Sequence, residues 1–498
     1  MESLVALGGG LANALTPANL AFALIGCILG MLVGVLPGVG PTAGIAVLIP
    51  LTFSLDATGA IIMLAAIYYG AMYGGTITSV LLNTPGEAAS VVTCLDGYEM
   101  ARQGRGGVAL GVAAIGSFIG GTVATFGLVL VAPPLAAFAL TFGPAEQFAL
   151  LVLGLSTLIG LTGRSVVAGL MMGFIGLILG LIGIDPVVGA PRLTFGIVDL
   201  FDGIEFVSVV MGLFGISEIL LNLEQPALKI FETKVTSLFP KREEWGRVAG
   251  AVARGTGLGF FLGLIPGTNS AIASFLSYVV ERRFTKQPLG TGAIEGVAAP
   301  ETSNNAYTSA ALIPLFTLGL PSSPAIAVLL GAFIINGLVP GPLLFRDNPD
   351  FVWTVIASLY IGNFILLILN LPLVGMWVSV LKIRYSILMV MILVFAIVGS
   401  YSLNGSMFDV GMMFAFGLLG YIFKKVDLPM APLVLALVLG PLIERSLRTS
   451  LEISGGSPAI FYTSPIALTL LVLAAIVLLG ASLRLLPFQR GQLEEAEV

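Results

Sequence analysis

The chain has 498 residues, of which 57% are hydrophobic and only 10% are charged, and its formal net charge is −5. Soluble proteins carry about 25% charged residues, so this composition excludes a set of soluble domains and predicts a chain that lies within a lipid bilayer. The sequence contains no histidine, which excludes Ser-His-Asp triads, histidine-ligated zinc and proton relays through imidazole. No basic stripe is present that would suit nucleic acid. The two cysteines, Cys27 and Cys94, predict no disulfide framework.

The apolar segments begin after a start, MESLVALGGGLANALTPANL, that lacks the basic region of a secretory signal peptide. Since about 20 apolar residues cross the hydrocarbon core, we expect the following spans in the first half: 18–36, 60–82, 107–132, 146–162, 165–184 and 204–223. The spans expected in the second half are 249–265, 297–320, 353–377, 385–401, 407–423, 429–443 and 465–483. Shorter apolar pieces, predicted to be half-helices or re-entrant arms, are 42–53, 86–95, 268–280 and 322–338. The predicted fold is an all-α integral membrane protein with about 12 transmembrane segments plus re-entrant hairpins or broken helices.

The longest charged segment, 224–247, is predicted to be a cytoplasmic linker between two halves. On either side of it the motifs GMLVGVLPG, from Gly30, and GFFLGLIPG, from Gly259, match at all four Gly and Pro positions. A weaker pairing joins LLNTPGEAAS, around Pro85, to TLGLPSSPAI, around Pro321. We therefore predict a repeat. Its units and the parts around them are 1–223 (first repeat), 224–247 (linker), 248–445 (second repeat) and 446–498 (a C-terminal transmembrane segment with a polar tail).

The charges beside these motifs indicate how the halves are oriented. After the first motif the first half reads FSLDAT, with no Lys or Arg, and the second half reads ERRFTK, with three. After the second motif the first half reads ARQGRG, with two Arg, and the second half reads FRDNPD, with one Arg and two Asp. The charge bias between the halves is therefore reversed. Since cytoplasmic loops carry an excess of Lys and Arg, the two repeats are predicted to be inverted. Pro266-Gly267 is predicted to form the tip of a helical hairpin that enters from the cytoplasmic side, and Pro37-Gly38 the tip of a hairpin that enters from the opposite face. The sequence leaves the path of residues 57–100 open.

Interrupted helices in inverted repeats are typical of secondary transporters, whose binding site lies where the interruptions meet. Free N–H groups at an interruption can bind a substrate anion, and free carbonyl groups can bind a cation. A Pro-Gly pair can equally be a kink or a packing notch, but two matching motifs in halves of opposite charge bias favour a site. The candidate substrate-binding residues are Pro37, Gly38, Gly40, Thr42, Asn83, Thr84, Pro85, Gly86, Pro266, Gly267, Thr268, Asn269, Ser270, Pro321, Ser322 and Ser323.

Ionisable residues at membrane depth are functional candidates by default. We take Glu87, Glu301, Asn304 and Asn305 as candidate cation ligands. A helix cap is an equal alternative for Glu87, and also for the segment ETSNN, which begins at Glu301. Three further groups are expected to play no chemical role. Glu205 and Glu218 are expected to face a polar seam, and Lys424 and Lys425 to lie at a cytoplasmic edge. Tyr68, Tyr69 and Tyr73 are expected to serve packing.

Five blocks of the sequence are specific rather than generic membrane sequence. They are VLPGVGPTAGIAVLIPLTF, YGAMYGGTITSVLLNTPGEAASVVTCLDGY, GLIPGTNSAIASFLSY, IEGVAAPETSNNA and LGLPSSPAIAVLLGAFIINGLVPGP. In this order they resemble the large membrane subunit of tripartite tricarboxylate transporters over nearly the whole chain. The family often reads PGxG where this chain has Pro266-Gly267-Thr268-Asn269, and PGS where it has Pro321-Ser322-Ser323. The resemblance implies a multi-pass secondary transporter of the bacterial inner membrane that works with a periplasmic substrate-binding protein and a small four-helix membrane subunit.

The leading hypothesis is therefore import of tricarboxylates or related carboxylates, driven by a cation gradient. Without imidazole the available ligands are carbonyl, hydroxyl and amide groups and helix ends, which favours Na⁺ as the coupling ion and calls for no other cofactor. Coupling to H⁺ through Glu87 or Glu301 stays open, as does a homodimer. A channel is the less favoured reading because no TVGYG-like filter or acidic ring is present. A membrane enzyme is disfavoured because no G-x-S-x-G motif is present, and a passive assembly subunit is a further alternative.

Overall fold

The computed structural model describes residues 2–36, 38–161, 165–185, 187–224, 237–380 and 385–483. Within these ranges it is helical almost throughout, with one antiparallel ribbon of β1 (Gly183–Ile184) and β2 (Pro191–Arg192). The helices of the first half are α1 (Glu2–Ala14), α2 (Pro17–Val35), α3 (Gly40–Leu48), α4 (Ala57–Leu82), α5 (Val91–Arg102), α6 (Gly106–Ala139), α7 (Pro144–Leu161), α8 (Val166–Gly180), α9 (Phe206–Val210) and α10 (Ser217–Asn222). Those of the second half are α11 (Trp245–Gly263), α12 (Ser270–Glu281), α13 (Glu295–Ala310), α14 (Leu312–Leu318), α15 (Pro324–Ile335), α16 (Pro342–Asp347), α17 (Pro349–Asn370), α18 (Val374–Val380), α19 (Tyr385–Asn404), α20 (Met407–Lys425), α21 (Met430–Ile453), α22 (Ile460–Thr463) and α23 (Pro465–Ser482).

Helix length and hydropathy confirm an all-α membrane protein. Seven helices of the described ranges are long and apolar enough to cross a bilayer: α2, α4, α6, α17, α20, α21 and α23. The most hydrophobic 18-residue stretch of α4 is completely buried and that of α23 is 17% buried, so α4 forms the centre of the molecule and α23 its apolar periphery. The predicted count of about 12 spans stays a prediction, because several expected spans form helices shorter than 18 residues. One of them is the continuous apolar helix Phe206–Asn222, which consists of α9, a π-helical turn η4 (Met211–Ile216) and α10.

Glycines let two pairs of helices pack with their backbones in contact. A Cβ atom at Gly34 of α2 would lie 2.2 Å from the carbonyl oxygen of Ala71 in α4. In the second half, a Cβ at Gly259 of α11 would lie 2.2 Å from the carbonyl oxygen of Ser303 in α13. The matched glycines of the two motifs are therefore close-packing positions, and each motif helix lies directly along a second, buried helix.

Both matched motifs end a helix and start a shorter one that returns. Arg254 of α11 forms an ion pair of 2.5 Å with Glu281 at the end of α12, so α11 and α12 form the predicted hairpin. The short helix α3 packs back on α2, since a Cβ at Gly44 would touch the side chain of Val33 at 2.5 Å. Residues 57–100, left open by the sequence, form α4, a left-handed turn at Asn83 with φ 54°, a 3-10 turn η2 (Ala88–Ser90) and α5.

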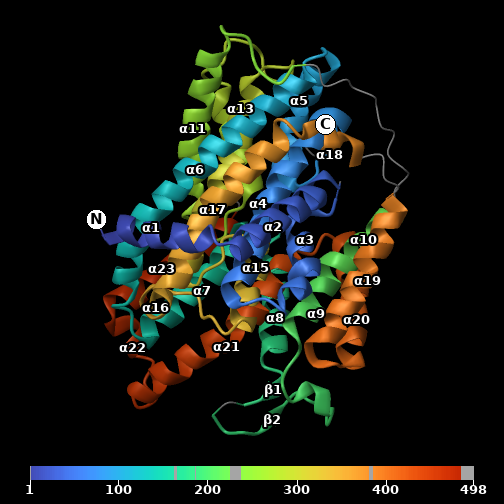
Figure 1. Cartoon of the computed structure of the whole chain (residues 1–498). Coiled ribbons are helices and arrows are strands. Elements are labelled where there is room, and N and C mark those ends of the chain that lie inside the picture. Colours follow the sequence, from blue (N-terminus) through green and yellow to red (C-terminus); the bar gives the residue numbers. More distant parts are fainter. Residues whose placement is uncertain are drawn as a thin grey trace.

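Two basic segments lie at one end of the molecule. Figure 1 shows the end of α5 and the starts of α11 and α13 at the upper end, and the β1–β2 ribbon at the lower end. The upper end carries the basic segments ARQGRG and ERRFTK, which the sequence predicts to be cytoplasmic. Of the predicted linker, residues 225–236 lie outside the described residues. The inverted repeat and the domain limits stay predictions.

Candidate functional site: a central cavity at four helix interruptions

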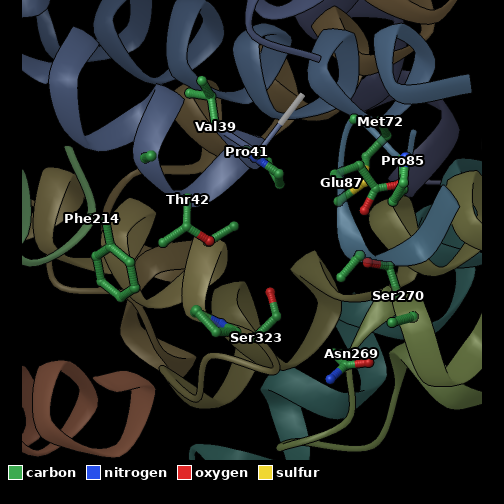
Figure 2. Close-up of a pocket in the computed structure, with 18 of the residues that line it drawn as sticks. Val39, Pro41, Thr42, Met72, Pro85, Glu87, Phe214, Asn269, Ser270 and Ser323 are labelled. Atoms are coloured by element: carbon green, nitrogen blue, oxygen red, sulfur yellow. The ribbon is translucent and has the colours of Figure 1, made fainter. Parts of the chain in front are cut away.

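A cavity of about 430 Å³ lies where four helix interruptions meet (Figure 2). This volume is in the range of small-molecule sites, about 300–1,000 Å³. Each interruption contributes a short stretch to its wall, and these stretches are 38–43, 85–88, 269–271 and 323–325. Segments from both halves of the chain thus share one wall, as the hypothesis of converging interruptions requires.

Helix N-termini give the cavity its electrostatic character. The helices α3, α12 and α15 begin at Gly40, Ser270 and Pro324, and all three residues line the cavity. Asn269 caps α12, its Oδ1 accepting the N–H of Ile272 at 2.8 Å, while Ser323 caps α15 through a longer contact. Because the N-terminal end of a helix carries a partial positive charge and free N–H groups, this convergence favours an anion.

The fourth interruption differs, because it carries a carboxylate. The side chain of Glu87 caps η2, accepting the N–H of Ala89 at 2.6 Å, and its backbone N–H contacts Ser90 Oγ in return. Glu87 is therefore a cap, one of the two roles weighed for it. Its second oxygen accepts from Asn304 Nδ2 at 3.2 Å, so the carboxylate joins the cavity wall to the buried helix α13.

The predicted substrate residues divide into two groups. Those that line the cavity are Gly38, Gly40, Thr42, Pro85, Gly86, Asn269, Ser270 and Ser323. Those that lie on the turns behind it are Asn83, Thr84, Pro266, Gly267, Thr268, Pro321 and Ser322. Thr268 illustrates the second group, since its hydroxyl donates to the carbonyl oxygens of Leu262 at 2.7 Å and Ile265 at 2.8 Å and thereby closes the end of α11. Pro37 lies outside the described residues.

Behind Glu87, the polar helix α13 is buried along all 16 of its residues. It begins at Glu295 rather than at ETSNN, so a cap at Glu301 is wrong. The helix continues past Pro300, and its first residue pairs with Arg247 at 2.5 Å. Glu301 therefore lies in the middle of the helix, where its carboxylate accepts the hydroxyl of Thr76 at 2.6 Å and that of Thr93.

The buried carboxylates differ in their partners. Glu281 and Glu295 each form an ion pair with an arginine, and Asp96 accepts several backbone N–H groups from the loop before α13. Glu87 and Glu301, in contrast, contact only hydroxyl, amide and backbone N–H donors among the described residues, and each has few of them. A buried charge without a charged partner is costly, so these two sites favour either a bound cation or a proton.

The side-chain amides of Asn304 and Asn305, next to these carboxylates, also have unpaired oxygen atoms among the described residues. The Oδ1 atoms of Asn304 and Asn305 are buried without a hydrogen-bond donor among the described residues. Asn305 Nδ2 donates to Ser117 Oγ at 2.7 Å and to the carbonyl oxygen of Glu301 at 3.1 Å, which fixes the orientation of that amide. Buried acceptors of this kind normally have a partner, such as an ordered water or a cation. Within the described residues no group of three or more acidic or cysteine side chains forms a metal cluster.

Several cavity residues were not predicted from the sequence. They are Pro41, Tyr68, Met72, Phe214, Glu218 and Lys424. Lys424, expected at a cytoplasmic edge without chemistry, lines the cavity and forms an ion pair with Glu218. These two residues are 206 positions apart, and no motif in the sequence joins them.

Interrupted helices whose N-termini meet at one central cavity are typical of membrane transport proteins. Comparison with known sequences makes this specific: the chain belongs to the tripartite tricarboxylate transporter TctA family, whose model matches residues 20–435. This confirms the resemblance. The family is one of transporters rather than enzymes, and it works in a tripartite system with substrate-binding and small membrane subunits.

Two relatives come from Agrobacterium vitis. The chain is 47% identical over 501 residues to an uncharacterised 52.8 kDa protein in the TAR-I ttuC′ 3′ region, a match that covers 100% of this chain and 99% of the relative. It is 46% identical over 236 residues to an uncharacterised protein in the TAR-II ttuC′ 3′ region, covering 47% of this chain and 98% of the relative. No solved structure matches.

Proposed function

We propose that this chain is the subunit that carries a tricarboxylate or related carboxylate across the bacterial inner membrane into the cell, driven by a cation gradient with Na⁺ as the coupling ion. It receives the substrate from a periplasmic binding protein and works beside a small four-helix membrane subunit. The observation that supports the anionic substrate is the meeting of the N-termini of α3, α12 and α15 at one cavity.

The cation is assigned to the oxygen atoms behind the cavity. Glu87 lines the cavity and contacts Asn304, which lies one helical turn from Glu301. A cation held here would sit close to the bound anion, and each would lower the cost of burying the other. Binding of the two would therefore be coupled, as symport requires.

Uptake of citrate into proteoliposomes tests the proposal. The purified chain is reconstituted with its small subunit and its binding protein, and [¹⁴C]citrate uptake is followed with an inward Na⁺ gradient, with a pH gradient, or with neither. We expect saturable uptake that needs the Na⁺ gradient. Uptake driven by the pH gradient alone favours the alternative, H⁺ carried by Glu87 or Glu301. Uptake that does not saturate favours a channel.

Substitution of Glu301 locates the coupling ion. Glu301→Gln keeps the shape of the side chain and its proximity to Thr76 and Thr93, but removes the charge. We expect the Na⁺ concentration for half-maximal citrate uptake to rise about tenfold or more, because a charged ligand is lost. The matched control is Glu99→Gln, which removes a partly exposed carboxylate at the end of α5 and should leave Na⁺ activation unchanged. An unaltered response in Glu301→Gln would remove this residue from the cation site.

A further inference from the structure

The central cavity has a charged side that none of the helix interruptions supplies. Lys424, in the last turn of α20, is the one cationic side chain among the described residues that line the cavity. Its Nζ donates to Glu218 Oε2 of α10. The two side chains are 25% and 15% exposed, so this pair is largely withdrawn from solvent and is a stronger electrostatic element than a surface ion pair.

Glu218 also connects this pair to the first interruption. Its Oε1 accepts from Asn222 Nδ2 at 3.1 Å. A Cβ atom at Gly38 would lie 3.0 Å from the same Oε1, and Gly38 has φ +86°. The turn that starts α3 therefore lies directly against the carboxylate that holds Lys424.

The charged side of the cavity wall lies next to the N-terminus of α3 and away from the N-terminus of α12. Figure 2 shows Phe214 across the opening from Glu87, and Ser270 and Asn269 on the side of Glu87. Glu218 follows Phe214 by four residues, which places it on a neighbouring part of the same helical face. An anion between the two sides would meet the helix N–H donors at one end, with the Glu87 carboxylate beside them, and Lys424 at the other.

We propose that Lys424 binds one carboxylate of the substrate while the N-termini of α12 and α15 bind another, so that the site requires at least two carboxylates. Glu218 competes with the substrate for Lys424 and thereby sets the affinity. This inference rests on the proposed carboxylate transport. It assigns the preference for multiply charged anions to the pair on α10 and α20, outside the interrupted helices. Binding exchanges one carboxylate for another on the same ammonium group: the Lys424–Glu218 contact is broken, Glu218 keeps the hydrogen bond from Asn222, and no covalent bond changes.

The chain contains a matched control next to this pair. Lys425 forms an ion pair with Glu224, and both side chains are 46% exposed. Neither residue lines the cavity. Neutralising Lys425 removes the same charge one position further along α20 without changing the cavity wall, so a difference between the two variants reports on the position of the charge and not on the net charge.

The test measures KM and kcat for citrate, succinate and butyrate, in proteoliposomes that hold the chain, its small subunit and its binding protein. We expect Lys424→Gln to raise the KM for citrate and succinate about tenfold or more, and Lys424→Arg to restore most of the affinity. Glu218→Gln should lower the KM for both, the opposite direction, which a merely misfolded variant would not show. Lys425→Gln should behave as the wild type, and butyrate should be a poor substrate for all variants.

Three outcomes overturn the inference. If wild-type citrate uptake is saturable and Lys424→Gln has the wild-type KM, Lys424 is not a substrate ligand, while the proposed transport stands. If Glu218→Gln raises the KM as much as Lys424→Gln does, the pair only supports the fold. If the wild type takes up none of the three acids in a saturable way, the proposed function fails, and this inference fails with it.

Discussion

Asn269 combines two roles at the scale of the single residue. Its side chain caps α12 by accepting the N–H of Ile272 at 2.8 Å, and the residue lines the central cavity. Aspartate caps helices as well as asparagine does, so a substitution can separate the cap from the charge.

The variant Asn269→Asp should therefore fold normally but transport poorly. The added negative charge faces the substrate carboxylate in a partly desolvated cavity, and we expect kcat/KM for citrate uptake to fall about tenfold or more. Uptake assays and the apparent unfolding temperature in detergent separate the two effects. Ser165→Asp is the control, because Ser165 caps α8 away from the cavity lining. Full activity of Asn269→Asp would show that the N-terminus of α12 does not face the anion.

The cavity residues that could be predicted from the sequence are those marked by neighbouring residues in the chain. Gly38, Asn269 and Ser323 could be found because Pro and Gly mark a helix end and polar residues follow it. Glu218 and Lys424 could not, because each looks like an ordinary charge at a helix end, and only the fold brings α10 beside α20.

At the scale of the element, substitutions in α11 can test whether its glycines allow close packing against α13. A Cβ at Gly259 would lie 2.2 Å from the carbonyl oxygen of Ser303, whereas at Gly257, in the same helix, it would meet nothing within 4 Å. Gly259→Ala should destabilise the protein by about 1–3 kcal/mol through overpacking. Gly257→Ala should be neutral or slightly stabilising. Apparent unfolding temperatures in detergent provide the measurement, and equal values for the two variants would contradict backbone contact between α11 and α13.

The β1–β2 ribbon is joined to α21 by a charged contact that depends on pH. The Arg448 guanidinium donates to the Asp185 carboxylate at 2.9 Å, and the N–H groups of Val188 and Val187 donate to it as well. These donors, Arg448 first, hold the pKa of Asp185 well below its usual range. A carboxyl group whose pKa is lowered by folding stabilises the fold above its unfolded pKa, about 3.9, and loses that effect as the pH falls towards its folded pKa.

Asp185→Asn should accordingly lower the apparent unfolding temperature at pH 7, by an amount that shrinks below about pH 5. Thermal unfolding in detergent between pH 7 and pH 3 measures this difference. Asp347→Asn removes a carboxylate whose ion pair with Arg346 is exposed, and such pairs contribute little, so this variant should follow the wild type. If Asp185→Asn lowers the apparent unfolding temperature by the same amount at every pH, the charge of the carboxylate is not the cause of the destabilisation.

The element scale also shows what composition leaves open. The helix α13, with the sequence EGVAAPETSNNAYTSA, is rich in polar residues and lies largely within the expected span 297–320, and every residue of it is buried. Its polar groups find partners on α4, α5 and α6, among them Thr76, Thr93 and Ser117. Glu301 was chosen for its charge, but its position in the middle of this helix required the structure. The sequence predicts a span over 297–320 but cannot show which groups meet its polar side chains, because the partners come from three other elements.

At the scale of the whole molecule, the arrangement in the membrane follows from the charges and from the paths of the helices. The segments after the first motif, FSLDAT and ERRFTK, occupy equivalent places in the two halves. If the halves are inverted, these segments lie on opposite sides of the bilayer. Ser54 and Lys286 are exposed members of the two segments, and both native cysteines are buried, so labelling of an introduced thiol would have a low background.

In intact cells, a membrane-impermeant maleimide should label Ser54→Cys, while Lys286→Cys should be labelled only after the membrane is opened. The reason is that an excess of Lys and Arg is retained on the cytoplasmic side, and Lys286 follows Arg282 and Arg283 whereas Ser54 has no basic neighbour. Retained citrate uptake in both variants serves as the control for native insertion. Labelling of both thiols from one side would contradict inverted repeats.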